Sequence, residues 1–244
     1  MSDNIRCWIT GCAVLSSNKV ILADNNNSKL KVVDIQSKLA TEEKSLDSKP
    51  RDIAVLPQDQ IAVTMPGKKE ILVMTPASKF STIRRISVKG VCQGITYHQG
   101  QLYVLCWNPY SVHIVDIQGN VNNTISLNSE IFVSPNYILV SEDARHIYIS
   151  DYTSHSVVSV TLQGDVSAVY KHQDLSKPVG MVMLDDGSFL VCCYYNNTIH
   201  HISGDLKSGH TILDGLQWLW SIYYNHHQQE VYIGGQCDQL KIME

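Results

Sequence analysis

A short apolar run recurs along this chain at an almost constant interval. The runs are 41, 41, 45, 42 and 42 residues apart and begin at Val20, Ile61, Leu102, Ile147, Phe189 and Val231. A second set has spacings of 41, 41, 45, 42 and 41 residues and begins at Leu30, Ile71, Val112, Val157, Ile199 and Leu240. Because two registers share one period, the sequence indicates a repeat architecture in which each unit stacks on the next.

Each pair of runs reads as a β-hairpin, because both arms alternate and are rich in β-branched residues. The connections carry turn residues, as at Pro66-Gly67 and Asn196-Asn197. One short strand precedes each hairpin and another follows most of them. Four strands per repeat predict an all-β fold, a six-bladed β-propeller with four-stranded antiparallel blades. The expected blades span about 9–50, 51–92, 93–136, 137–179, 180–220, and 221–244 together with 2–7.

The sixth repeat ends after its third strand, at Glu244. The segment Ser2–Cys7 precedes the first inner strand and has no other assigned place. We therefore expect it to pair as the outer strand of the last blade and to close the ring, which would remove an exposed sheet edge. On this interpretation residues 1–244 form one propeller domain, which we expect to be monomeric.

Composition excludes several classes of protein. The chain is 44% hydrophobic and 17% charged, with a net charge of −4, so intrinsic disorder is excluded. No apolar run approaches the roughly 18 residues of a membrane span, and the N-terminus does not read as a secretory signal. Seven cysteines form an odd set, which favours reduced thiols. We therefore expect a cytoplasmic protein that does not contact membranes.

One face of a propeller collects the connections between blades and the turns between the second and third strands of each blade. Loops on a rigid scaffold commonly carry function, and aromatic residues with Arg are typical of recognition surfaces. The predicted ligand-binding residues on this top face are Arg51, Trp107, Asn108, Tyr110, Tyr152, His155, Tyr194, Tyr195, Trp218 and Trp220. Arg51 would supply a forked donor for an acidic or carbonyl group. Trp218 and Trp220 fit equally well as residues that wedge the last two blades together.

Charge is unevenly distributed along the chain. Residues 1–92 carry a net charge of +5 and residues 93–244 a net charge of −9. The candidate nucleic-acid contacts in the basic sector are Lys68, Lys69, Arg84 and Arg85. Such a sector beside aromatic residues suits single-stranded RNA, whereas a solvated rim is the ordinary explanation for basic residues on or before an outer strand. Protein, RNA and carbohydrate therefore all stay open as partners.

Catalytic signatures are absent from the sequence. It has no HExxH motif, no P-loop, no GxSxG motif and no paired CxxC motif. Neighbouring residues of a strand point to opposite faces, so His200-His201 and Cys192-Cys193 cannot act as local chelating pairs. We read both cysteines as small core residues. The sequence thus predicts no catalytic residues, no metal site, no cofactor and no enzymatic activity.

The unit that contains Pro178-Val179-Gly180-Met181, Asp185-Asp186-Gly187 and Asn196-Asn197-Thr198-Ile199 resembles the NHL repeat. The segment 11–35 is similar to the first blade of the NHL-like C-terminal domains of tripartite-motif (TRIM) proteins. The resemblance covers the whole chain and implies a domain that recognises a protein, or sometimes RNA, for an attached ubiquitin ligase. The RING, B-box and coiled coil of such ligases are not found in this sequence. The NHL aspartate that ends the second strand is present only at Asp24 and Asp151.

Two other propeller classes serve as alternatives. Gluconolactonase-like enzymes often hold a metal among acidic residues of the inner strands, whereas Asp52 is one of few carboxylates expected there. Lectin-like propellers stack sugars on aromatic residues, and the Asn-rich turns would then give several similar sites. The stoichiometry of binding distinguishes repeated sugar sites from a single protein site.

Overall fold

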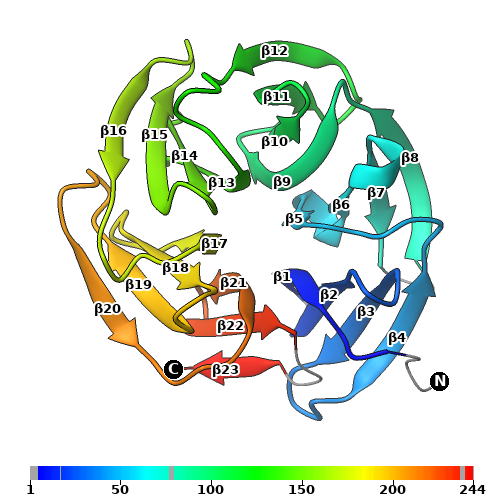
Figure 1. Ribbon diagram of the computed structural model, residues 1–244. Helices are drawn as coiled ribbons and strands as arrows, with labels where there is room; N and C mark the ends of the chain where they lie inside the picture. Colours follow the sequence, from blue (N-terminus) through cyan, green and yellow to red (C-terminus); the bar gives the residue numbers. More distant parts are fainter. Residues whose placement is uncertain (1–4, 17, 77–79, 237–239, 244) are drawn as a thin grey trace.

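The computed structural model describes residues 5–16, 18–76, 80–236 and 240–243, and its strands form six antiparallel sheets arranged in a ring (Figure 1). In each sheet the strands follow one another in chain order, from the ring centre outwards. Five sheets have four strands, and the described part of the sixth has three. The prediction of an all-β, six-bladed propeller is therefore confirmed.

The first three blades cover the first half of the chain. Blade 1 contains β1 (Ile9–Leu15), β2 (Lys19–Asp24), β3 (Lys29–Asp34) and β4 (Ala40–Ser45). Blade 2 contains β5 (Ile53–Val55), β6 (Ile61–Met65), β7 (Glu70–Thr75) and β8 (Ser81–Ser87), with the short 3-10 helices η1 (Pro57–Asp59) and η2 (Pro66–Lys68). Blade 3 contains β9 (Val91–His98), β10 (Gln101–Trp107), β11 (Ser111–Asp116) and β12 (Val121–Ser126).

The remaining blades follow the same plan. Blade 4 contains β13 (Pro135–Val140), β14 (His146–Asp151), β15 (Ser156–Thr161) and β16 (Val166–Tyr170). Blade 5 contains β17 (Pro178–Met183), β18 (Phe189–Cys193), β19 (Thr198–Ile202) and β20 (Gly209–Leu213). Blade 6 contains β21 (Leu219–Asn225), β22 (Glu230–Gly235) and β23 (Lys241–Met243).

The core lies between neighbouring blades, so the middle strands are buried on both faces. All residues of β6 and β18 are buried, whereas most residues of the outer strands β4 and β12 are exposed or half-buried. This explains why the second strand of each repeat reads as an almost continuous apolar run.

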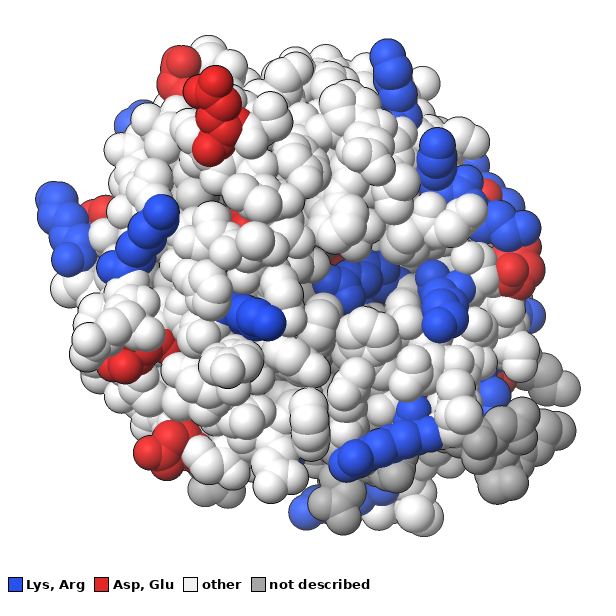
Figure 2. All heavy atoms as spheres, viewed as in Figure 1, with Lys and Arg blue, Asp and Glu red and all other residues white. Residues whose placement is uncertain are grey.

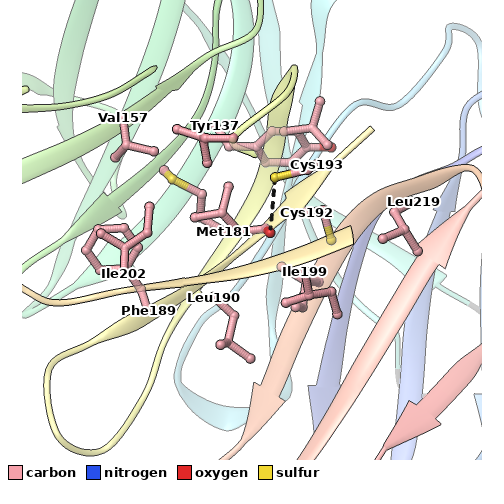
Figure 3. Packing of buried hydrophobic residues seen from close by; sticks show 14 of the residues in the cluster. Tyr137, Val157, Met181, Phe189, Leu190, Cys192, Cys193, Ile199, Ile202 and Leu219 are labelled. Atoms are coloured by element: carbon pink, nitrogen blue, oxygen red, sulfur yellow. Dashed lines mark hydrogen bonds between the residues drawn. The ribbon is translucent and has the colours of Figure 1, made fainter. Parts of the chain in front are cut away.

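Figure 3 shows the core around blade 5, where side chains of three blades meet. Tyr137 of blade 4 and Leu219 of blade 6 belong to the same cluster as Cys192 and Cys193. Both cysteines are free and buried, as predicted. Cys192 Sγ contacts Ser221 O at 4.0 Å, so this thiol helps to join blades 5 and 6.

The predicted closing strand is wrong for the part of 2–7 that is described, while residues 2–4 lie outside the described residues. Residues 5–7 belong to no strand and lie over blade 1 (Figure 1). Asn26 Nδ2 and Asn27 Nδ2 donate to the carbonyl oxygens of Arg6 and Ile5, both at 3.0 Å. These hydrogen bonds hold residues 5–7 against the turn of blade 1. Blade 6 contacts blade 1 directly, through the hydrogen bond from Ser221 Oγ to Ile9 O at 3.2 Å.

The two helices of the described chain have three residues each. No helix among the described residues is long and apolar enough for a membrane crossing.

Candidate functional site

A cavity of about 580 Å³ opens at the centre of the top face. Figure 2 shows this face, with basic atoms in the central hollow. The wall is drawn from five blades and from the N-terminal segment: Trp8, Asn25, Ser48, Lys49, Arg51, Pro66, Gly67, Gln93, Trp107, Ser134, Asn136, Tyr152 and Trp220. Four residues of the predicted top-face set, Arg51, Trp107, Tyr152 and Trp220, therefore lie together in one wall.

Arg51 is held at the floor of this cavity by contacts from several blades. Its backbone N–H donates to Thr64 O at 2.9 Å, and its Nη2 donates to Asn136 Oδ1. The guanidinium carbon lies 4.9 Å from the centre of the Trp220 ring and 5.4 Å from that of Tyr137. Cation–π contacts of this kind stabilise a charge that has lost water. Only 7% of Arg51 is exposed, so its position is fixed before any ligand arrives.

β-Bulges place two further residues in the wall. Pro135 pairs with Asp151 and Tyr137 with Ser150, so Asn136 is the extra residue of a bulge in β13. In β21 the pairing skips from Leu219 to Ser221, and the extra residue is Trp220. A bulge redirects a side chain that a regular strand would bury between blades. The irregular tops of the inner strands thus turn Asn136 and Trp220 towards the cavity.

Aromatic rings pack around Trp220. The ring centres of Trp8 and Tyr194 lie 4.8 and 5.1 Å from that of Trp220, both in edge-to-face geometry. Tyr152 lies 6.2 Å from both Trp220 and Tyr194. We call Trp8, Tyr152, Tyr194, Trp218 and Trp220 the aromatic cluster. Trp220 is 9% exposed and contacts residues of blades 2, 4 and 5, so it both joins blades and lines the cavity.

The outer side of the aromatic cluster reaches solvent. Trp218 is 43% exposed, lies 6.2 Å from Tyr194, and receives support from Asn197 Oδ1, which accepts from its backbone N–H at 2.8 Å. Lys177 Nζ lies 5.0 Å from the Tyr152 ring and 5.2 Å from the Tyr195 ring, and Tyr195 is 70% exposed. These residues form an open rim beside the cavity.

The other predicted top-face residues lie away from the cavity wall. Tyr110 OH donates to Val133 O at 2.6 Å, and Asn108 is exposed at its turn. His155 is also exposed, and its Nδ1 accepts from the backbone N–H of Lys177 at 3.1 Å. None of these three residues lines the cavity. Tyr110 and His155 instead form hydrogen bonds with neighbouring loops.

The residues predicted from the sequence do not include Trp8, Lys49 and Lys177. Trp8 was missed because it falls between residues 2–7, which were assigned to blade 6, and the expected start of blade 1 at residue 9. The signal that could have found it is Asp24, which ends the second strand and accepts from the backbone N–H of Trp8 at 3.2 Å. Lys31 Nζ lies 2.9 Å from Asp24 Oδ2, which favours the charged carboxylate, and the pKa of this buried carboxyl is lowered.

The basic residues proposed for RNA lie on the rim of blade 2, and acidic neighbours neutralise part of their charge. Asp47 Oδ2 lies 3.6 Å from both Lys68 Nζ and Arg85 Nη2, and Arg85 also pairs with Glu70. Arg84 Nη1 donates to Ile117 O at 2.9 Å, while Lys69 occupies a left-handed turn position. This environment is typical of a solvated rim.

We expect the variant Arg84→Glu/Arg85→Glu to bind a single-stranded RNA pool no more weakly than the unmodified chain, because these side chains are already engaged. A filter-binding titration at several salt concentrations measures this. Strong binding with a steep salt dependence that disappears in the variant would instead support the RNA interpretation.

A second cavity, of about 330 Å³, lies deeper between the inner strands and includes Cys12, Asp52 and Tyr137 in its wall. Asp52 Oδ1 and Oδ2 accept from the backbone N–H groups of Ile53 and Ile95, both at 2.9 Å. Burial raises the pKa of this carboxyl to about 7. Because Asp52 links blade 2 to blade 3, its first role is structural. No group of His, Cys, Asp and Glu residues that could hold a metal ion occurs within the described part of the chain.

The fold is similar to that of several solved structures. Virginiamycin B lyase from Staphylococcus aureus has a TM-score of 0.74 and 15% identity, covering 99% of this chain and 82% of that one. A streptogramin B lyase has a TM-score of 0.75 and 17% identity, covering 99% and 81%. A protein of unknown function from Bacteroides caccae has a TM-score of 0.76 and 15% identity, covering 94% and 90%. No protein-family model and no curated protein sequence matches the chain.

These similarities bear on two predictions made from the sequence, the absence of enzymatic activity and the resemblance to NHL and TRIM domains. The prediction that the chain is not an enzyme is overturned, because two of these structures are lyases built on the same type of propeller. The resemblance to NHL and TRIM domains is supported only at the level of the six-bladed propeller. At 15% and 17% identity the likeness shows the fold and does not assign a reaction.

Proposed function

We propose that this chain is a recognition module that holds a protein partner on its top face, with one group of the partner inserted into the cavity. The propeller fold is consistent with a binding or scaffold module. The observation that carries the proposal is the aromatic cluster, which lines the cavity with Trp8, Tyr152 and Trp220 and continues to an exposed rim at Trp218. Buried aromatic anchors surrounded by a rim are typical of protein interfaces.

The geometry favours one site per chain over repeated sites. The cavity lies at the ring centre, and the five blades that form its wall contribute unlike sets of residues, for example Arg51 with Pro66 from blade 2 and Gln93 with Trp107 from blade 3. A lectin-like propeller with a sugar in each blade would require similar pockets around the ring. We therefore expect a binding stoichiometry of one, and a stoichiometry of several ligands per chain would support carbohydrate binding.

We propose further that the bound protein is a substrate of a TRIM-type ubiquitin ligase, which this module would recognise. It rests on the NHL-like repeats and on the buried aspartates Asp24 and Asp151, which organise the turns of blades 1 and 4. Asp151 Oδ1 accepts from the backbone N–H groups of Thr153 at 3.1 Å and Ser154 at 2.9 Å. A ligase role would require the module to act beside a RING domain.

A selection from a random peptide library displayed on phage tests the proposal. We expect selected peptides to bind Trp218→Ala at least tenfold more weakly than the unmodified chain, because the exposed indole is lost without disturbing the core. The matched control is Ile212→Ala, which removes a side chain that is 45% exposed on the outer strand β20. Titration by fluorescence polarisation with synthetic peptides gives the dissociation constants.

Two results would contradict the proposal. Selected peptides that bind Trp218→Ala as tightly as the unmodified chain would place the interface elsewhere, and selection that enriches no peptide would remove the peptide ligand. Because lyases share this fold, mass spectrometry of each bound peptide is needed as well. An altered mass would show that the top face transforms its ligand and does not merely bind it.

A further inference from the structure

We propose that the floor of the top cavity is a carboxylate receptor, formed by Arg51 with the indole N–H groups of Trp8 and Trp220. The group that a partner inserts would then be acidic: a chain-terminal carboxylate or the side chain of Asp or Glu. This inference rests on the proposed function, because it names the chemical group that the top face recognises. It concerns the floor of the cavity, whereas the peptide experiment above tests the exposed rim.

Arg51 carries a buried positive charge, and no carboxylate of the described residues lies within ion-pair distance of it. Arg51 is 93% removed from solvent, since 7% is exposed, and it forms no ion pair with any described residue. The neighbouring Asp52 uses both oxygens to accept from the strand amides of Ile53 and Ile95. Burying a charge outside an ion pair is costly, and the cation–π contacts together with the longer-range Coulombic attraction of Asp52 recover only part of that cost. A ligand carboxylate would supply the missing counter-charge.

The same cavity wall holds three residues with buried donor groups that have no acceptor among the described residues. Arg51 Nε, Trp8 Nε1 and Trp220 Nε1 are all buried and have no hydrogen-bond partner among the described residues. All three residues belong to the wall of the same cavity. Guanidinium and indole groups donate and cannot accept, so their complement must be an acceptor. Buried groups of this kind are normally paired, and three unpaired donors in one wall point to a ligand.

The charge of the cavity wall also favours a negative ligand. Arg51 and Lys49 are its charged residues, and none of the described residues in the wall is Asp or Glu. Lys49 is exposed, so its charge acts at the opening of the cavity and Arg51 acts at its floor. A negative group is therefore attracted into the cavity and meets no opposing carboxylate there.

A carboxylate fits this site better than a phosphate. One buried guanidinium balances one negative charge, whereas a phosphate monoester carries −1.5 to −2 charges at neutral pH. The wall around Arg51 combines polar residues with the apolar and aromatic side chains of Pro66, Trp107 and Tyr152. Such walls suit an apolar group next to the acid. The ligand expected here is a carboxylate that carries an aromatic or aliphatic group about as large as one or two amino-acid residues.

Three small ligands test the assignment and separate its two sources. Acetyl-Gly-Phe carries a terminal carboxylate, acetyl-Gly-Phe amide carries none, and acetyl-Asp-Phe amide carries only a side-chain carboxylate. Each is titrated into the ¹⁵N-labelled chain while the indole N–H signals are followed by NMR. We expect at least one acid to bind at least tenfold more tightly than acetyl-Gly-Phe amide. The signals of Trp8 and Trp220 should move, while that of Trp218 should stay in place.

Variants identify the anchoring charge. The variant Arg51→Gln should lose the tenfold preference for the acid over the amide. The variant Ser208→Ala should keep this preference, because Ser208 lies in the connection between β19 and β20 and is not part of the cavity wall. If Arg51→Gln does not fold, the comparison of acid with amide on the unmodified chain still decides. A rise in ionic strength should weaken binding of the acids and leave the weak binding of the amide unchanged.

The outcomes separate this inference from the function on which it rests. Equal binding of acids and amide, or no binding of any of the three at millimolar concentration, would overturn the carboxylate receptor. If the carboxylate receptor is overturned but library peptides still require Trp218 for binding, the proposed function stands without the receptor. If the acids bind as expected while no library peptide is enriched, the receptor stands and its ligand is a small acid.

Discussion

Replacing Gly180 with alanine is expected to lower the free energy of unfolding by about 2–3 kcal/mol, the upper part of the range for overpacked cores. Gly180 lies on the inner strand β17, against the inner strand of blade 6. A Cβ atom there would lie 2.6 Å from Trp220 O and 2.8 Å from Ser221 Cα. Because both atoms belong to backbone, the strands must separate. The same shift would move Trp220, so the cavity wall should loosen as well.

Thermal unfolding followed by circular dichroism measures this effect, with an expected fall in Tm of roughly 4–12 °C for a chain of this size. The matched control is Gly67→Ala. Its Cβ would lie 2.8 Å from Ser48 Oγ, a hydroxyl that can rotate away. We expect that variant to change stability by no more than about 0.5 kcal/mol. Equal stability of Gly180→Ala and the unmodified chain would show that the two blades are not in close contact.

The same close approach recurs around the ring centre. A Cβ on Gly11 would lie 2.9 Å from Asp52 Cα, and one on Gly94 would lie 2.9 Å from Tyr137 Cα. The inner strands of blades 1, 3 and 5 thus carry glycine where those of blades 2, 4 and 6 carry a larger residue. This alternation of small and large residues fits six strands around one axis.

A second large effect is expected on acidification, through His200. The ring is fully buried on β19, where burial lowers its pKa from 6.5 to about 4, helped by the nearby His172. The unfolded chain therefore gains a proton near pH 6.5 that the folded chain does not accept until about pH 4. Stability from this group is present above pH 6.5 and is lost as the pH falls towards 4. The free energy of unfolding should fall by about 3 kcal/mol, because each unit of difference between the unfolded and folded pKa is equivalent to about 1.36 kcal/mol.

Urea unfolding at pH 7 and pH 4 tests this through the variant His200→Gln. Glutamine keeps a polar partner for Tyr170 OH, which lies 2.8 Å from His200 Nε2, but it does not titrate. The unmodified chain should lose about 3 kcal/mol more than the variant between the two pH values. The matched control is His227→Gln, which makes the same replacement at an exposed histidine in the turn after β21. Parallel curves for His200→Gln and the unmodified chain would contradict the assignment. The titratable groups facing His200 are Tyr170, His172, Asp174, His201 and His210, and they remain in every variant.

The repeats were sufficient to predict the blades because each blade is local in sequence. Strands such as β18 and β19 are joined by a short turn, and their apolar pattern is fixed by burial on both faces. The same reasoning correctly assigned Cys192 and Cys193 to the core. It failed for residues 5–7, because an extended segment can pair with any open edge. The Asn26 and Asn27 side chains that hold this segment on blade 1 carry no repeat signal.

The sequence by itself determined the ring, the number of blades and the face that collects the turns. Only the tertiary structure decided which of these turn residues form a site. Trp8 and Trp220 are 212 positions apart, yet their ring centres lie 4.8 Å apart because the ring brings its first and last blades together. Bulges, which leave no mark in the periodicity, turn Asn136 and Trp220 inwards beside Arg51. Local pattern specifies strands, whereas a site depends on contacts between residues from blades that are distant in the chain.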